Sequence, residues 1–201
     1  MLGEIEMKIA IDLDGTILNS ENSLKYYADY FSYFYCNGKV RKKDDDVSQE
    51  NCFDWTKEEE NRFFNEFFDI ASEDCDLIVG SKQILKKLKE EGHQLYIISL
   101  RGYYRDEELK VGEKAVKKLG IDFDGVFFKV KNKFEKCKEL GIDLLIDNDS
   151  KYVKEFKDSS VNVIFLRDGY IEKIEGKNIM TAETWVDVYR EIKEIQSNVS
   201  N

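Results

Sequence analysis

Short apolar segments alternate with amphipathic ones along most of this chain, and the alternation limits the folds open to it. Five segments rich in β-branched, Leu and aromatic residues have the length of strands: 7–12, 94–99, 125–128, 143–147 and 161–166. Four segments with apolar residues at helical spacing follow or separate them: 81–91, 107–119, 133–140 and 181–195. Strands that alternate with helices are typical of a parallel sheet, so the sequence predicts an α/β fold.

The stretch 20–80 breaks this alternation, because it contains no convincing parallel strand. Aromatic and apolar residues recur at helical spacing in 24–34 and again in 63–68. Thr56 and Glu59 form the pattern of a capping box before the second run. Inserted directly after the first strand, these helices are expected to lie over the carboxyl end of the sheet as a lid. We therefore predict a sheet core made of 1–19 and 81–201, and a helical cap made of 20–80.

The first strand ends in two aspartates, Asp12 and Asp14, followed by Gly15 and Thr16. Residues i and i+2 of a strand point to the same face, so the two carboxylates are expected side by side. Open parallel sheets bind their ligands at this end of the strands. Two close carboxylates repel each other unless a cation lies between them, and Mg²⁺ prefers oxygen ligands. The alternative is that Asp and Gly serve only as turn formers.

Three further polar features follow apolar strands later in the chain. Ser99 ends the segment 94–99, and its hydroxyl could donate a hydrogen bond to a phosphoryl oxygen. Lys133 opens a predicted helix, with Lys129 and Lys131 as nearby competitors for the same role. Asp147 begins an acidic turn after an apolar strand and could complete a metal site.

The order Asp-x-Asp-Gly-Thr, Ser, Lys and acidic turn resembles the four signatures of the haloacid dehalogenase (HAD) superfamily, over about residues 7–195. The resemblance implies a doubly wound parallel sheet with the first strand central. It implies that Asp12 is a nucleophile that forms an aspartyl-phosphate, and that Asp14 is the general acid and base. It further implies that Ser99 and Lys133 neutralise the phosphoryl group, and that Mg²⁺ is held by Asp12, Asp147 and the backbone carbonyl of Asp14.

The fourth signature departs from the family pattern, in which two consecutive acids are common. Here the second position is Asn148, and Asp149 follows it. Which of the two supports the metal stays open. We also assign four residues beside the signatures to substrate or phosphate binding: Gly15, Thr16, Leu100 and Arg101. For Arg101, an ordinary loop arginine is the alternative.

Two segments carry a resemblance at a finer level: the stretch from Phe53 to Phe67, and Asp143–Asp147 after a Lys-x-x-x-Cys helix. In these segments the chain resembles the cytosolic deoxyribonucleotidase-like proteins of the superfamily, which have a small helical cap. This resemblance implies a phosphomonoesterase that acts on nucleoside monophosphates. Four aromatic residues of the predicted cap, Tyr26, Tyr30, Phe53 and Trp55, could stack on a base. The alternatives are a phosphatase for another small metabolite such as a sugar phosphate, a phosphotransferase, or a catalytically silent HAD-fold binding protein.

Composition narrows the partners. The 201 residues carry a net charge of −10, which disfavours binding to nucleic-acid polymers. No run of 18 apolar residues predicts a membrane span, and the start of the chain does not have the pattern of a signal peptide. The four cysteines show neither metal-ligand spacing nor close pairing, so we expect reduced thiols in a cytoplasmic protein. The single histidine, His93, is predicted to lie in a surface loop. A small phosphorylated substrate is the expected partner, and a homodimer is a possible assembly.

Overall fold

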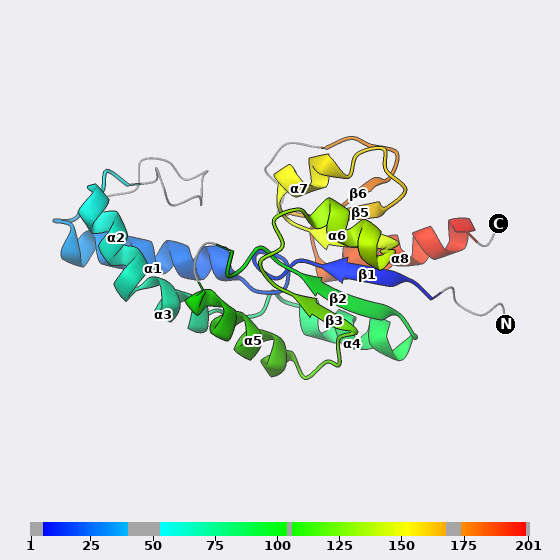
Figure 1. Cartoon of the computed structure of the whole chain (residues 1–201), viewed down its shortest axis with the longest axis horizontal. Helices are drawn as coiled ribbons and strands as arrows, with labels where there is room; N and C mark the ends of the chain where they lie inside the picture. The colour runs from blue at the N-terminus through cyan, green and yellow to red at the C-terminus, as the bar shows by residue number, and fades with distance from the viewer. Residues whose placement is uncertain (1–5, 40–52, 104–105, 168–173, 200–201) are drawn as a thin grey trace.

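Figure 1 shows the computed structural model of the chain, which describes residues 6–39, 53–103, 106–167 and 174–199. One six-stranded parallel sheet crosses the described residues in the order β3-β2-β1-β4-β5-β6. The strands are β1 (Lys8–Ile11), β2 (Gln94–Ile98), β3 (Gly125–Phe127), β4 (Leu144–Asp147), β5 (Asn162–Leu166) and β6 (Ile179–Ala182). Because β1 pairs with both β2 and β4, it lies inside the sheet, and the predicted α/β fold with a doubly wound parallel sheet is confirmed.

Helices cover both faces of the sheet. Because successive residues of a strand point to opposite sides, a single strand contributes side chains to both of the packed faces. Ile9 and Ile11 pack against residues of three helices, α4 (Ser81–Glu90), α5 (Glu107–Leu119) and α8 (Trp185–Val199). Ala10 packs on the other face with residues of α6 (Lys133–Leu140) and α7 (Ser150–Glu155). β1 is therefore buried on both sides, which holds its carboxyl end in a fixed position.

Three helices occupy the described part of the inserted stretch: α1 (Ser20–Tyr35), α2 (Lys57–Glu66) and α3 (Phe68–Glu73). They lie beyond the carboxyl end of β1 and form a separate, elongated unit (Figure 1). A cluster of their own, centred on the fully buried Phe31 and Phe63, holds them together. The expected capping box is present at α2: Thr56 Oγ1 accepts a hydrogen bond from Glu59 N, and Glu59 accepts one from Thr56 N.

Three elements escape the sequence prediction, and one is misplaced. The strand β6 and the two six-residue helices α3 and α7 were not expected. The predicted helix 181–195 begins later, because Thr181 and Ala182 pair with β5 as part of β6, and α8 starts at Trp185. β6 is short and only its last residue is buried, so its sequence lacks the apolar run typical of an inner strand.

The prediction that His93 lies in a surface loop is wrong. Its side chain is 1% exposed, and its Nδ1 accepts a hydrogen bond from Met7 N at 3.1 Å. The loop before β2 turns inward at this point, and the imidazole satisfies a main-chain donor at the start of the sheet. Cys36, Cys75 and Cys137 are free thiols, while Cys52 lies outside the described residues. In the described part of the chain, no helix has both the length and the apolarity to cross a membrane.

Candidate active site

The turn after β1 places Asp12 and Asp14 at the edge of a large cavity. Asp12 continues the sheet pairing, since its N–H donates to the carbonyl of Ile146 at 3.0 Å, and its side chain is buried. Gly15 then turns the chain with a φ of +71°. The backbone angle at Gly15 favours glycine, and a Cβ there would lie 2.0 Å from Asn148 Nδ2 and would displace that side chain.

A buried ion cluster joins Asp12 to the next strand. Lys133 Nζ donates to Asp12 Oδ1 at 2.8 Å and to Asp147 Oδ2 at 2.6 Å. All three residues are at most 5% exposed. Asn132 caps α6 by accepting a hydrogen bond from Glu135 N at 3.0 Å, so Lys133 enters the site from the first turn of that helix. The structure thus brings together three residues that lie up to 135 positions apart in the sequence.

The two competitors of Lys133 point elsewhere. Lys129 forms an ion pair with Asp106, and Lys131 lies over the ring of Tyr103 at 5.3 Å. Neither residue lines the cavity, whereas Lys133 does. Its ammonium also lies 4.2 Å from the centre of the Tyr152 ring, a contact that the sequence did not reveal. A buried lysine needs such partners, since an unpaired charge in the interior is costly.

Burial raises the pKa of Asp12 to about 7, and the neighbouring carboxylates add to this effect while Lys133 opposes it. Burial likewise raises the pKa of Asp147. Burial alone would lower the pKa of Lys133, but the charges of Asp12 and Asp147 raise it above its ordinary value. One ammonium therefore faces two buried carboxylates, so the cluster carries a net negative charge when both are ionised, and a further positive charge would stabilise it.

Asp12 and Asp147 present hard oxygen donors, and their excess negative charge fits a divalent cation such as Mg²⁺. In the structure, Lys133 lies between the two carboxylates and donates a hydrogen bond to each. Within the described residues, no group of three or more His, Cys, Asp or Glu side chains is arranged to hold a metal ion. The Asp14 carboxylate is engaged with Arg101, which leaves its backbone carbonyl as the group to offer a cation. The donor chemistry thus fits the predicted metal.

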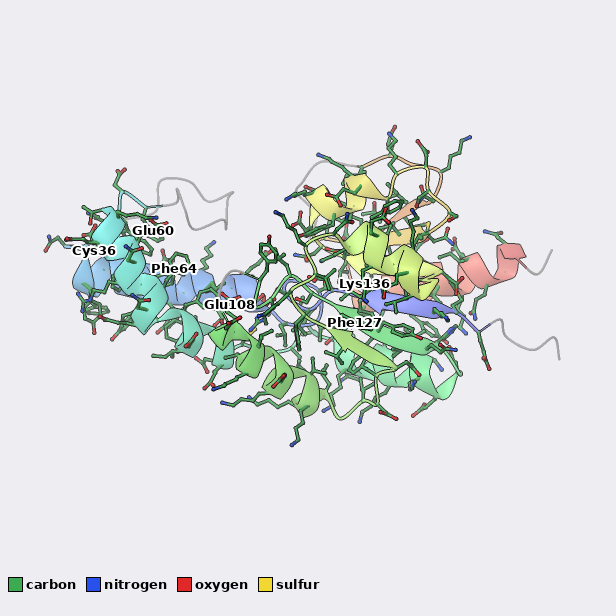
Figure 2. The ribbon with its side chains drawn as sticks, viewed as in Figure 1. Cys36, Glu60, Phe64, Glu108, Phe127 and Lys136 are labelled. Atoms are coloured by element: carbon green, nitrogen blue, oxygen red, sulfur yellow. The ribbon has the colours of Figure 1, made fainter. Side chains whose placement is uncertain are left out.

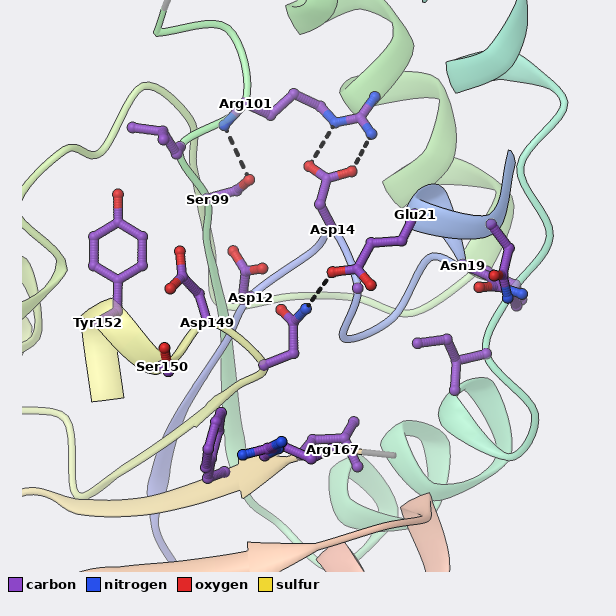
Figure 3. Close-up of a pocket in the computed structure, with 18 of the residues that line it drawn as sticks. Asp12, Asp14, Asn19, Glu21, Ser99, Arg101, Asp149, Ser150, Tyr152 and Arg167 are labelled. Carbon is purple, nitrogen blue, oxygen red and sulfur yellow. Dashed lines mark hydrogen bonds and ion pairs between the residues drawn. The ribbon is translucent and has the colours of Figure 1, made fainter. Parts of the chain in front are cut away.

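Ser99 and Arg101 follow β2 on the other side of Asp12. Ser99 is buried, and its Oγ accepts a hydrogen bond from Arg101 N at 3.1 Å. The Arg101 guanidinium donates to both carboxylate oxygens of Asp14, from Nε at 3.0 Å and also from Nη2 (Figure 3). We assigned Arg101 to phosphate binding, but its contact in the structure is with Asp14. Leu100 lines the cavity beside them.

Asn148 connects the turn after β4 to the base of the cap. Its Oδ1 accepts a hydrogen bond from Thr16 Oγ1 at 3.1 Å, and its Nδ2 donates to Glu21 Oε1 at 3.1 Å. Thr16 is fully buried and does not line the cavity, whereas Gly15 does. Asp149 caps α7 by accepting from Lys151 N at 2.8 Å, and its own N–H donates to Asp147 Oδ1 at 2.9 Å.

The cavity itself has a volume of about 1390 Å³ and lies between the strand ends and the cap. The cap contributes Phe64 and Phe68 to its wall, and the core contributes Arg167 at the end of β5. Figure 2 shows Phe64 on α2 of the cap and Glu108 near the start of α5, and both residues line the cavity. The helical spacing of residues 63–68 does not indicate whether Phe64 and Phe68 face this cavity or the interior of the cap.

The four cap aromatics that we expected near a base do not line this cavity. Phe53 and Trp55 stack on each other at 4.6 Å inside the cap cluster. Tyr26 and Tyr30 are 62% and 38% exposed on the outside of α1. Helical spacing groups residues on one face, but it does not indicate which face turns toward the site.

Models of known protein families give no match to the chain, and no curated protein matches it significantly. Solved structures do resemble it. A haloacid dehalogenase-like hydrolase from Streptococcus pneumoniae has a TM-score of 0.66 at 14% identity, with 92% of this chain and 98% of that chain covered. A haloacid dehalogenase-like hydrolase from Xanthomonas campestris has a TM-score of 0.66 at 10% identity, with 98% and 99% covered. A protein described as a predicted phosphoglycolate phosphatase from Haemophilus somnus has a TM-score of 0.58 at 16% identity, with 92% and 97% covered.

The chain therefore has the fold of HAD-like hydrolases. These comparisons do not confirm the deoxyribonucleotidase-like subfamily, and at such identities they speak to the fold alone.

Proposed function

We propose that this protein is a Mg²⁺-dependent phosphomonoesterase that acts through an aspartyl-phosphate on Asp12. The observation that carries the proposal is the buried cluster of Asp12, Lys133 and Asp147 at the carboxyl end of an inner strand, with Asp12 and Lys133 on the wall of the cavity. A catalytically silent binding protein would have no need to keep a costly buried charge cluster beside a second aspartate.

In the first step, a carboxylate oxygen of Asp12 attacks the phosphorus, and the bond from phosphorus to the leaving oxygen breaks. Asp14 gives its proton to that oxygen. Lys133 and the Ser99 hydroxyl neutralise the charge on the transferring phosphoryl group. In the second step, a water attacks the phosphorus, Asp14 takes a proton from that water, and phosphate leaves as Asp12 is restored.

Asp12, Asp147 and the carbonyl of Asp14 are the groups that would hold Mg²⁺. When bound, the ion supplies Lewis-acid polarisation of a phosphoryl oxygen. Lys133 has its own role beside it, since it orients both carboxylates from within hydrogen-bond distance.

For the substrate we propose a nucleoside monophosphate, more specifically a deoxynucleotide. The cavity of about 1390 Å³ is large for a two- or three-carbon phosphate, and Phe64 and Phe68 offer it aromatic surface. Base–aromatic stacking contributes about 1–3 kcal/mol, which corresponds to roughly ten- to hundredfold in specificity. A sugar phosphate or another small phosphorylated metabolite is the competing substrate, and it would gain little from these rings.

Hydrolysis of an aryl phosphate, measured with Mg²⁺ and with EDTA, tests the reaction. We expect slow turnover that chelation abolishes, and unchanged turnover in EDTA would contradict the metal assignment. Specificity constants for deoxynucleotides and sugar phosphates then test the substrate. Equal constants, or higher ones for sugar phosphates, would refute the nucleotidase proposal and leave the phosphatase intact.

A further inference from the structure

The ion pair between Arg101 and Asp14 has no part in the two steps given above. The guanidinium approaches Asp14 side-on, with Nε donating to Oδ2 at 3.0 Å and Nη2 donating to Oδ1. Such a two-point contact fixes the orientation of a carboxylate as well as its position. Asp14 is the residue that must exchange protons in the proposed reaction, so its orientation matters for the rate.

Arg101 is the fixed member of this pair. Its side chain is 5% exposed, whereas that of Asp14 is 37% exposed. Its main chain is held at both ends, by the bond from its N–H to Ser99 Oγ and by the bond from Lys129 N to its carbonyl at 3.0 Å. On α5, a Cβ at Gly112 would lie 2.9 Å from Arg101 Cδ, so the helix leaves space for the arginine stem only because this residue is glycine.

The guanidinium is not arranged to bind a substrate phosphoryl group. Nε and Nη2 are taken by Asp14. Nη1 is buried and has no hydrogen-bond partner among the described residues, so it does not offer an exposed donor to the cavity.

We propose that Arg101 is a positioning residue for Asp14, which rests on the phosphomonoesterase function proposed above. A carboxylate has about four lone-pair sites, and Arg101 uses two of them. In the first step, the protonated carboxyl of Asp14 keeps one bond from Arg101 on its carbonyl oxygen and transfers its proton from the other oxygen to the leaving group. In the second step, that oxygen takes a proton from water, and Asp14 is returned to the protonated state.

A role in proton transfer predicts a dependence on the leaving group that a role in phosphate binding does not. We would compare 4-nitrophenyl phosphate, whose phenolate leaves without help, with 4-nitrobenzyl phosphate, whose alkoxide needs a proton. The variants are R101M, R101K and D14N, together with the double variant D14N/R101M. Lys114→Met is the matched control, because it removes an exposed ion pair away from Asp14, the contact between Lys114 on α5 and Glu73.

The rate of aspartyl-phosphate formation is measured in single turnovers, alongside the KM, inhibition by inorganic phosphate, and the melting temperature. R101M is expected to slow the benzyl ester at least about tenfold more than the nitrophenyl ester, with little change in KM, since a well-placed acid contributes roughly 10²–10⁴-fold. R101K, which keeps the charge with different geometry, should show a smaller selective loss. D14N/R101M should be no slower than D14N, and Lys114→Met should match the wild type.

An equal loss for both esters with a raised KM and weaker phosphate inhibition would overturn the proposal and make Arg101 a phosphate ligand. Lower melting temperatures with unchanged rates would make it a structural ion pair only. If R101M does not fold, R101K decides, and wild-type rates on both esters in R101K would overturn the proposal. Absence of turnover in the wild type would instead refute the phosphomonoesterase function itself.

Discussion

The sheet and the cap bury their apolar residues in different ways. Ile9, Ala10 and Ile11 of β1 are all fully buried, because helices cover both faces of the strand. In α1, only four of sixteen residues are buried, and several tyrosines on its outer side are exposed. The strand is held by neighbours from the whole chain, whereas the cap helix depends on a few aromatic anchors.

The connection between the two parts is correspondingly slender. Two segments cross it side by side, joined by bonds from Asn19 N to Asp76 O and from Ile78 N to Ile17 O, each 2.8 Å. Helix α3 also contacts α5, with the exposed pair of Lys114 and Glu73 between them. We infer that the carboxylates of the candidate active site are held by the stable part of the molecule, and that the cap is the unit that opens locally.

The variant D12N gives the largest expected effect, and it separates the contribution of Asp12 to turnover from its contribution to stability. An amide is a poor nucleophile, so we expect a loss of at least about 10³-fold in turnover. In metal-free buffer the variant should be no less stable than the wild type, because Lys133 keeps Asp147 as its partner. Thermal melts of both proteins, with turnover assays in parallel, make the measurement.

The stability difference should also depend on pH. Burial raises the pKa of Asp12 from an ordinary value of 3.8 to about 7, so the folded state binds this proton more tightly than the unfolded state. Wild-type stability is therefore expected to fall relative to D12N as the pH rises from about 4 to 7. A stability difference between the wild type and D12N that stays constant over this pH range would contradict the raised pKa of Asp12.

The contrast between the two parts is next tested by F31A in the cap and L145A in the sheet. Both side chains are fully buried, and such truncations cost roughly 3–5 and 2–5 kcal/mol respectively. F31A should expose amides of α1 and α2 to hydrogen exchange while the sheet stays protected, whereas L145A should lower protection everywhere. Equal loss in both parts with F31A would mean that cap and core unfold as one unit.

These two parts also differ in what the sequence could predict. The inner strands are continuous apolar runs, so their positions follow from local composition, and Lys133 follows from its place at a helix start before an acidic turn. The pairing of Arg101 with Asp14 joins residues 87 positions apart, and only the three-dimensional arrangement brings them together. The hydrogen-bond partner of the buried His93, Met7 N, is likewise distant, 86 positions away in the sequence.

In the cap, periodicity located helices but not their orientation. Phe64 and Phe68 face the cavity, while Tyr26 and Tyr30, on an equally regular stripe, face outward. β6 escaped prediction because it has four residues, of which only Ala182 is buried, so its sequence has no apolar pattern. The strand is held in the sheet by its backbone pairing with β5.

The connection between cap and core can be probed by exchanging the donor and the acceptor of the hydrogen bond between Asn148 and Glu21. N148D removes the donor and sets two carboxylates together, which should cost about 0.5–1.5 kcal/mol. E21Q alone should be nearly neutral, since a glutamine oxygen still accepts the bond. The double variant should recover the loss, because the amide introduced on α1 can donate to the carboxylate introduced after β4. Chemical denaturation of all four proteins gives the coupling, and simple additivity would show that the bond does not join cap to core.

An effect of similar size is expected at two similar helix caps, Thr56 at α2 in the cap and Thr184 at α8 in the core. Replacing either with Ala should cost about 1 kcal/mol. T56A should appear as faster local exchange in α2, and T184A as a lower global stability. The reverse pattern would contradict the assigned difference between the two parts.

The Thr56 cap also carries a pH signature. Hydrogen bonds from Lys39 and from Thr56 N lower the pKa of Glu59 to about 2. Its contribution is therefore present above about pH 4.5 and is lost as the pH falls toward 2. The difference in amide hydrogen exchange of α2 between the wild type and E59Q should therefore become smaller as the pH falls across this range.

The most direct test of the account is to trap the phosphorylated enzyme. The protein would be mixed with 4-nitrophenyl phosphate and Mg²⁺, quenched in acid during the burst of nitrophenolate, and mapped by mass spectrometry. We predict phosphate on the peptide that contains Asp12, in an amount that follows the burst, and none in D12N. A burst with the phosphate on another residue, or with D12N labelled like the wild type, would contradict Asp12 as the nucleophile.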